Sequence, residues 1–176
     1  MTMHLTVYNS FVEIALVVIE KETTFKAQKE KMFLNKSGIA SNEINVIIGI
    51  TGNATGNMLY SMNKATATAI ASKMMEEELS EIDDLVKSSI AELANVITGR
   101  GAKELENRGY PITISPPLLL LGSGTMIENL DIPRVDVPIL LTPPPSGDLR
   151  PQENNATALG ELKIIISMSL KKTANN

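Results

Sequence analysis

Glu92 and Asn95 stand three residues apart in the longest helical pattern of the chain. On a helix, residues at positions i and i+3 are neighbours, with Cβ atoms about 5 to 6 Å apart. The other residues on this face are small: Ser88, Ala91, Gly99 and Ala102. Because a solvated helix face usually carries long charged side chains, this face could instead be docked by another molecule.

The two side chains have different chemistry. A carboxylate can pair with a cation, and an amide can orient a water molecule without acting as a base. The Glu-x-x-Asn pattern is short, however. Two surface residues, with Gly99 and Ala102 serving only to let a neighbouring helix approach closely, would give the same spacing.

The composition excludes several other kinds of site. Cysteine is absent and His4 is the only histidine, so we expect no thiolate or histidine metal site and no Ser-His-Asp triad. A net charge of −4, with three Tyr, three Phe and no Trp, argues against nucleic acid. Neither a membrane span nor a signal-peptide pattern is present in the sequence. We therefore expect a cytoplasmic protein that binds no nucleic acid and no membrane.

The helix that would carry Glu92 and Asn95 is predicted over 80–109. Ser80, with Asp83 three residues later, predicts its N-terminal cap, and Gly109 followed by Pro111 predicts its end. Such a helix would have about 28 residues and a length of about 42 Å. Its other side forms an apolar stripe suited to packing on a sheet, made of Ile82, Val86, Ile90, Leu93 and Ile97.

Hydrophobic periodicity predicts the remaining elements. We expect helices over 5–20 and from Asn63 to about 76, and one edge strand within 22–36. Alternating residues predict a hairpin of strands 44–50 and 58–62, a strand over 112–121 with an edge or an interruption at Pro116 and Pro117, and strands over 135–139 and 161–170. The Pro- and Asn-rich segment 143–158 predicts a mobile loop.

This order of elements predicts an α/β (α+β) fold, in which long helices cover one face of a mainly antiparallel sheet. A length of 176 residues is within the usual size of one domain. We therefore expect residues 1–176 to form a single domain.

The segment from Ser88 to Lys103 resembles the signature helix of the CheX and CheC family of chemotaxis phosphatases. In that family a Ser or Asp, a Glu and an Asn have the spacing of Ser88, Glu92 and Asn95, and a proline follows further along, near the place of Pro116. The similarity extends through 48–57, 70–75 and 9–15, and covers about residues 5–141 and 159–172. CheC-type members carry two copies of the motif. The single copy here indicates the CheX type.

The resemblance implies a CheX-like fold and a substrate, the aspartyl phosphate of a CheY-like response-regulator receiver domain. Asn95 would orient the attacking water, Glu92 would pair with a receiver lysine, and Ser88, Ala91 and Gly99 would contact the receiver. No cofactor or metal would be bound by this chain, because Mg²⁺ belongs to the receiver, and a homodimer is expected. Two alternatives remain: a non-catalytic receiver-binding or scaffold protein of the same fold, and a small-molecule sensor using the apolar sheet interior.

Overall fold

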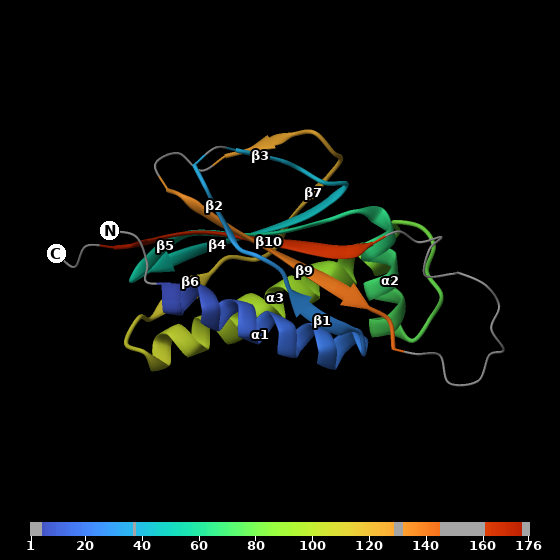
Figure 1. Cartoon of the computed structure of the whole chain (residues 1–176), viewed down its shortest axis with the longest axis horizontal. Helices are drawn as coiled ribbons and strands as arrows, with labels where there is room; N and C mark the ends of the chain where they lie inside the picture. Colours follow the sequence, from blue (N-terminus) through green and yellow to red (C-terminus); the bar gives the residue numbers. More distant parts are fainter. Residues whose placement is uncertain (1–4, 37, 129–131, 145–160, 174–176) are drawn as a thin grey trace.

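The computed structural model describes residues 5–36, 38–128, 132–144 and 161–173. Within these ranges, three helices lie together on one face of an eight-stranded sheet, below it in Figure 1. Every strand pair is antiparallel. This arrangement confirms the predicted fold class.

The elements follow one another as α1 (Leu5–Thr23), β1 (Lys26–Lys29), β2 (Phe33–Asn35), β3 (Ile39–Ala40), β4 (Ile44–Gly52), β5 (Ala54–Met62), α2 (Lys64–Met75), α3 (Asp84–Asn107), β6 (Ile112–Ile114), β7 (Leu118–Leu121), β8 (Met126–Ile127), β9 (Arg134–Thr142) and β10 (Leu162–Lys172). In the large sheet the strand order is β1-β9-β10-β5-β4-β6, with β2 also paired to β9 and β7 also paired to β4.

The core lies between the sheet and the helices. Alternate residues of the central strands point to the helices and are buried, which confirms the predicted hairpin of β4 and β5 and the predicted strand β10. Asn63 caps α2 as expected, because its side chain accepts a hydrogen bond from the backbone N–H of Thr66 at 2.8 Å.

The long helix α3 begins later than the sequence predicts. Its N-cap is Asp83, whose carboxylate accepts a hydrogen bond from the N–H of Val86 at 2.9 Å, so Ser80 lies outside the helix. The helix therefore has 24 residues rather than about 28. Ile82 precedes the helix, although its side chain still packs against the core. The end is near the predicted one, with Gly109 at a positive φ of 82°.

The strand predictions differ from the structure at the margins of the sheet. Segment 22–36 forms the end of α1 and two short strands, β1 and β2, rather than one edge strand. The predicted interruption at Pro116 and Pro117 is confirmed, because these residues separate β6 from β7. Strands β3 and β8, of two residues each, were not predicted.

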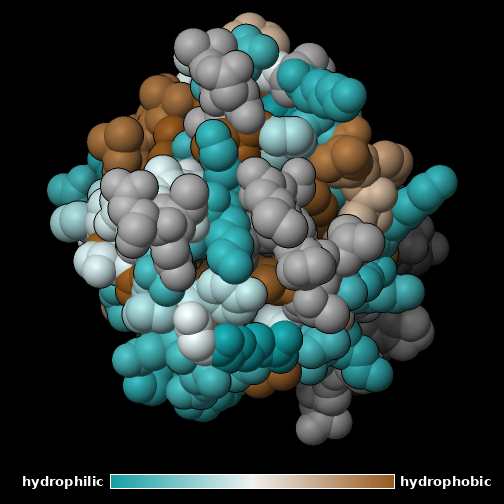
Figure 2. Space-filling view, turned by 90° about the vertical axis from the view of Figure 1, so that its left-hand side faces the viewer, coloured by the Kyte–Doolittle hydropathy of each residue, from teal (hydrophilic) through white to brown (hydrophobic). Residues whose placement is uncertain are grey.

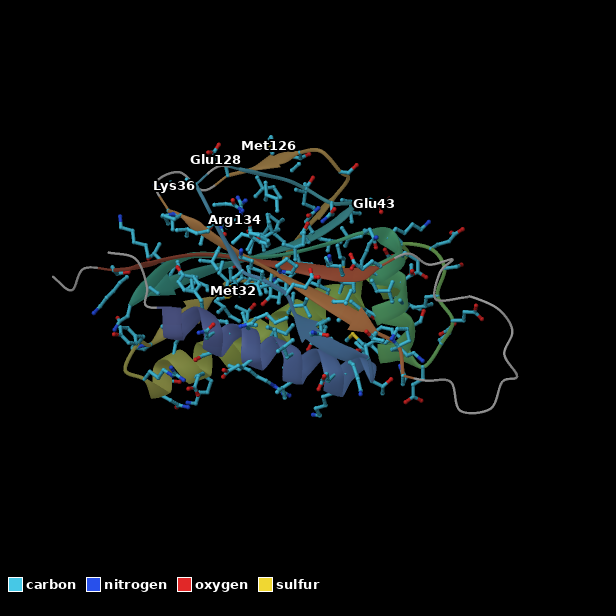
Figure 3. The ribbon with its side chains drawn as sticks, in the orientation of Figure 1. Met32, Lys36, Glu43, Met126, Glu128 and Arg134 are labelled. Carbon is cyan, nitrogen blue, oxygen red and sulfur yellow. The ribbon has the colours of Figure 1, made fainter. Side chains whose placement is uncertain are left out.

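Strands β3 and β8 form an arm on the side of the sheet away from the helices (Figure 1). Met126 and Glu128 lie on this arm, and Arg134, the first residue of β9, lies on the side of the sheet that faces it (Figure 3). Most of the loop predicted over 143–158 lies outside the described residues. In the part of the chain that the structure describes, no helix is both long and apolar enough to cross a membrane.

Helix α3 runs antiparallel to α1 and beside it (Figure 1). Their contact depends on Gly101, because a Cβ added there would lie 2.0 Å from the Cε1 atom of Phe11. Phe11 is fully buried in the core, so its ring has little room to move aside. Gly101 therefore sets how closely the two helices approach.

We predict that Gly101→Ala destabilises the protein. Alanine is the better helix former by about 1 kcal/mol, but overpacking a core costs about 1 to 3 kcal/mol, so the free energy of unfolding should fall by up to about 2 kcal/mol. Gly99→Ala is the matched control, because its added methyl would meet only Ile114, at 3.9 Å. Urea unfolding measures both variants. Equal stability of the two would contradict a special role of Gly101.

A buried ion pair lies on the other face of the sheet, in β9. The guanidinium of Arg134 donates to both carboxylate oxygens of Asp136, from Nε at 2.6 Å and from Nη2 at 3.0 Å. The side-chain amide of Asn35 in β2 also donates to Asp136. Burial alone would raise the pKa of Asp136, but the hydrogen bonds from Arg134 and Asn35 and the charge of Arg134 lower it below its ordinary value of 3.8.

We predict that Asp136→Asn destabilises the protein at pH 7, by on the order of 3 kcal/mol, because the buried ion pair between Asp136 and Arg134 is lost. Since the pKa of Asp136 is lower in the folded state than in the unfolded chain, the contribution of its carboxylate is fully present above about pH 4 and is lost as the pH falls through the folded pKa. The stability difference from the wild type should therefore shrink below pH 4.

Chemical denaturation between pH 2.5 and 7 measures this difference. Asp84→Asn is the control, because the Asp84 side chain is 98% exposed and its pair with Lys87 should contribute little at any pH. A stability difference for Asp136→Asn that stays constant with pH would contradict the role of the ion pair.

Candidate functional site

Helix α3 has a buried side and an open side. The buried side packs on α1, α2 and the sheet through Val86, Ser89, Ile90, Leu93, Ala94, Ile97, Thr98, Gly101 and Leu105. These residues include the predicted apolar stripe, apart from Ile82, which precedes the helix. Because this side is fixed in the core, the direction of the opposite side is fixed as well.

The structure brings all the sequence-predicted site residues together on the open side. Ser88 and Glu92 are exposed, whereas Ala91, Asn95 and Gly99 are half-buried. Their spacing of three or four residues places them along one stripe of the helix. None of the five contributes to the buried core. Their grouping on an accessible surface is therefore as predicted, whereas their roles remain predictions.

Glu92 differs from the other carboxylates of α3. Asp84 and Glu106 each pair with a Lys of the same helix, and Glu104 pairs with the C-cap residue Arg108, at 2.8 to 3.0 Å. Within the described part of the chain, the Glu92 side chain has no ion pair or hydrogen bond, and no basic residue stands three or four positions from it. An exposed, unpaired carboxylate is free to meet a cation of another molecule.

Asn95 lies one turn further along the open side. Across the described ranges, its side-chain amide also has no hydrogen-bond partner. Its neighbours Ala91 and Gly99 are too small to cover it. A half-buried amide with unused donors and acceptor can bind a water molecule or a polar group of a partner.

The sequence left open whether Gly99 serves only to let a neighbouring helix approach. The structure assigns that contact to Gly101, which packs on Phe11, whereas Gly99 faces almost empty space with only Ile114 of β6 at 3.9 Å from an added Cβ. Residues two apart on a helix point about 200° from each other, so the two glycines face different sides. Gly99 therefore leaves room on the open side rather than in the core.

The edge of the sheet lies beside this surface, because α3 contacts β6 and β7. Ser115 lies between these two strands and bonds to Gly49 of β4. The N–H of Gly49 donates to Ser115 Oγ, and the N–H of Ser115 donates to the carbonyl of Gly49, both at 2.9 Å. The adjoining Pro116 and Pro117 lack a backbone donor and have restricted φ. A fixed edge of the sheet thus adjoins the open side of α3.

A buried contact below the open side was not predicted. The hydroxyl of Tyr60 in β5 lies 2.8 Å from Thr98 Oγ1, three residues after Asn95. The alternation of β5 predicts that Tyr60 points inward, and a buried tyrosine hydroxyl needs a partner. Periodicity does not say which residue of another element provides that partner.

The described residues include no cluster of three or more Asp, Glu or His side chains that could hold a metal ion. In the view from the end of the molecule where α3 finishes, the layer of helices is mostly hydrophilic, and the apolar patches gather above it (Figure 2). The site on α3 therefore offers one carboxylate, one amide and small residues rather than a metal centre or a deep apolar pocket.

The fold has three helices on one face of an antiparallel sheet, with Glu and Asn on the open side of the longest helix. This combination defines a class of protein, and comparison with known proteins identifies it. Residues 44–140, which are more than half of the chain, match the family described as chemotaxis phosphatase CheX. The chain belongs to the CheX family. The matched range contains Ser88, Ala91, Glu92, Asn95 and Gly99.

One relative of known activity is the CheY-P phosphatase CheX of Thermotoga maritima, to which the chain is 36% identical over 87 residues. The match covers 49% of this chain and 56% of the relative, so it spans little more than half of the relative's length.

Solved structures share the fold at lower identity. A CheC-like superfamily protein from Shewanella sp. PV-4 has a TM-score of 0.76 at 20% identity, covering 96% of this chain and 99% of that one. CheX in the CheX-CheY-BeF3-Mg²⁺ complex from Borrelia burgdorferi has a TM-score of 0.72 at 23% identity, covering 94% and 97% of the two chains.

Proposed function

We propose that this protein accelerates the hydrolysis of the aspartyl phosphate of a CheY-like receiver domain. Asn95 orients the attacking water, and Glu92 pairs with a receiver lysine. The observation that carries the proposal is the open side of α3, where the side chains of Glu92 and Asn95, which have no partner within the described ranges, lie one turn apart among small residues. Such a surface suits insertion beside a reacting group in another protein.

The reaction requires few chemical groups from this chain. The water oxygen forms a bond to phosphorus while the bond between phosphorus and the aspartyl oxygen breaks, which yields an aspartate carboxylate and inorganic phosphate. Catalysis of phosphoryl transfer is mostly positioning and charge stabilisation, and an amide can orient the water without removing its proton. Asn95 can do this without a nucleophile, and Mg²⁺ is assigned to the receiver.

Two relatives support the proposal. The Thermotoga maritima relative is a CheY-P phosphatase, and the Borrelia burgdorferi protein is seen with CheY, BeF3 and Mg²⁺. A CheY-like partner of this chain is consistent with both. The pairing of Glu92 with a lysine follows from charge, because an unpaired carboxylate at the docking surface attracts a cation and fixes the register of docking.

Two further expectations accompany this function. A homodimer is supported by β7, an edge strand on which Leu118 and Leu121 are 62% and 48% exposed and could be covered by a second copy. A cytoplasmic location follows from the partner, because a chemotaxis receiver of this kind acts inside the cell.

We predict that Asn95→Ala removes most of the acceleration. Without the amide the water is no longer oriented, and a loss of positioning costs about 100-fold in rate. Stability should change little, because the Asn95 side chain makes no hydrogen bond in the described structure and alanine favours a helix. The measurement is the decay of a phosphorylated CheY-like receiver with Mg²⁺ present, in buffer and with each protein.

Asn107→Ala is the matched control, since Asn107 is the last residue of the same helix and is exposed. Full acceleration by Asn95→Ala would remove Asn95 from the mechanism. Receiver binding by the wild type without acceleration would instead support the scaffold function.

We also predict that Glu92→Lys weakens docking. Reversing the charge opposite a receiver lysine should cost about 2 kcal/mol, or about thirtyfold in affinity. Glu106→Lys is the control with the same change in net charge. It lies about 21 Å along the helix from Glu92, beyond the Debye length of about 8 Å at physiological salt. Titration calorimetry with the receiver measures both affinities. Equal affinity for the two variants would show that Glu92 is not the anchor.

A further inference from the structure

Among the described residues, one side-chain hydrogen bond ties α3 to the sheet. It joins the Tyr60 hydroxyl to Thr98 Oγ1 at 2.8 Å. Both side chains are buried, at 2% and 0% exposure, in a contact that is otherwise mostly apolar. A buried hydrogen bond is strong and directional, so it adds to the close packing of α3 a constraint on the two atoms that it joins.

The direction of this bond follows from the number of protons. Thr98 Oγ1 donates its single hydrogen to the carbonyl oxygen of Ala94, at 2.8 Å. The Tyr60 hydroxyl is therefore the donor to Thr98. The result is a chain of two hydrogen bonds from β5, through Thr98, to the carbonyl of Ala94.

That carbonyl belongs to the peptide unit that joins Ala94 to Asn95. The chain of hydrogen bonds thus starts in the sheet and ends on the backbone that carries the Asn95 side chain. Burial raises the pKa of Tyr60. The hydroxyl therefore remains a proton donor throughout the physiological pH range.

Asn95 depends on its backbone for its position. In the described part of the chain, its side chain has no hydrogen bond, and Ala91 and Gly99 beside it are small. Packed helices can shift by about 1 to 2 Å relative to their neighbours, and a misplacement of about 1 Å can cost about 100-fold in rate. A directional bond at this turn limits such a shift.

We infer that Tyr60 is a positioning residue, which holds the turn of α3 that carries Asn95 in the orientation needed to place the attacking water. This inference rests on the proposed function and adds a buried determinant of its rate. Tyr60 touches neither the receiver nor the water. Its effect passes through Thr98 and the peptide unit between Ala94 and Asn95.

The alternative is that the hydrogen bond only satisfies two buried hydroxyls. Tyr8 provides the matched comparison, because its buried hydroxyl donates to the carbonyl of Leu170 at 3.2 Å and ties α1 to β10. Neither α1 nor β10 carries a residue of the site. Tyr8→Phe and Tyr60→Phe each delete one buried hydroxyl, and only Tyr60→Phe breaks the chain that ends beside Asn95.

The first measurement is the rate of receiver dephosphorylation at increasing receiver concentration, for the wild type, Tyr60→Phe, Tyr8→Phe, Thr98→Val and Thr98→Ser. We expect Tyr60→Phe and Thr98→Val to lower kcat about tenfold with KM within twofold of the wild type, because docking through Glu92 is kept and water placement is impaired. Tyr8→Phe should keep the wild-type kcat. Thr98→Ser should restore most of it, because serine retains the hydroxyl.

An unchanged kcat in Tyr60→Phe overturns the inference, as does an equal decrease in Tyr8→Phe. An increase in KM with kcat retained also overturns it, because that result places the effect in docking.

The second measurement separates this inference from the proposed function. NMR residual dipolar couplings of the backbone amides of residues 94–98 report the orientation of this turn of α3 relative to the sheet. We expect the same couplings in the wild type and Tyr8→Phe, and changed or averaged couplings in Tyr60→Phe. If the wild type accelerates no receiver, the proposed function fails, and these couplings alone decide the positioning role. A change confined to Tyr60→Phe supports it, and the same couplings in every protein overturn it.

Discussion

The close contact of α1 and α3 at Gly101 constrains the rest of the site. An added Cβ at this position would overlap the ring of Phe11, so only glycine allows the two helices to reach this separation. With one side of α3 held against α1 and the sheet, rotation of the helix about its axis is fixed. The direction in which Glu92 and Asn95 point is therefore determined by packing on the far side of the helix.

This arrangement suits a protein whose chemistry is mainly positioning. A catalyst that supplies a nucleophile or a metal needs groups with altered acidity, usually in a secluded pocket. A protein that inserts an amide into a partner's pocket needs an accessible side chain on a rigid support. Helix α3 provides both, since Asn95 lies on the open side and Thr98, one turn away, is buried and bonded to the sheet.

Much of this could be predicted from the sequence, and the failures have local causes. The two sides of α3 follow from apolar periodicity over many residues. The start of α3 was placed wrongly because Ser80 and Asp83 are both good caps, and the hydrogen bond from Val86 selects Asp83. Strands β3 and β8 have two residues each, too few to show alternation. Contacts between distant segments, such as Tyr60 with Thr98, leave no periodic signal.

The two sides of α3 are under different structural constraints. Ser88, Ala91 and Gly99 bury little apolar area, so the open side can change to suit a partner at little cost in stability. Among the residues that the structure describes, the Glu92 side chain has no partner to lose, so a change there leaves no buried charge of these residues unpaired. On the buried side a side chain added at Gly101 would meet Phe11, and loss of the Thr98 hydroxyl would break the bond to Tyr60. Partner choice and water placement would therefore depend on different residues of one helix, so the partner can change while the position of Asn95 is kept.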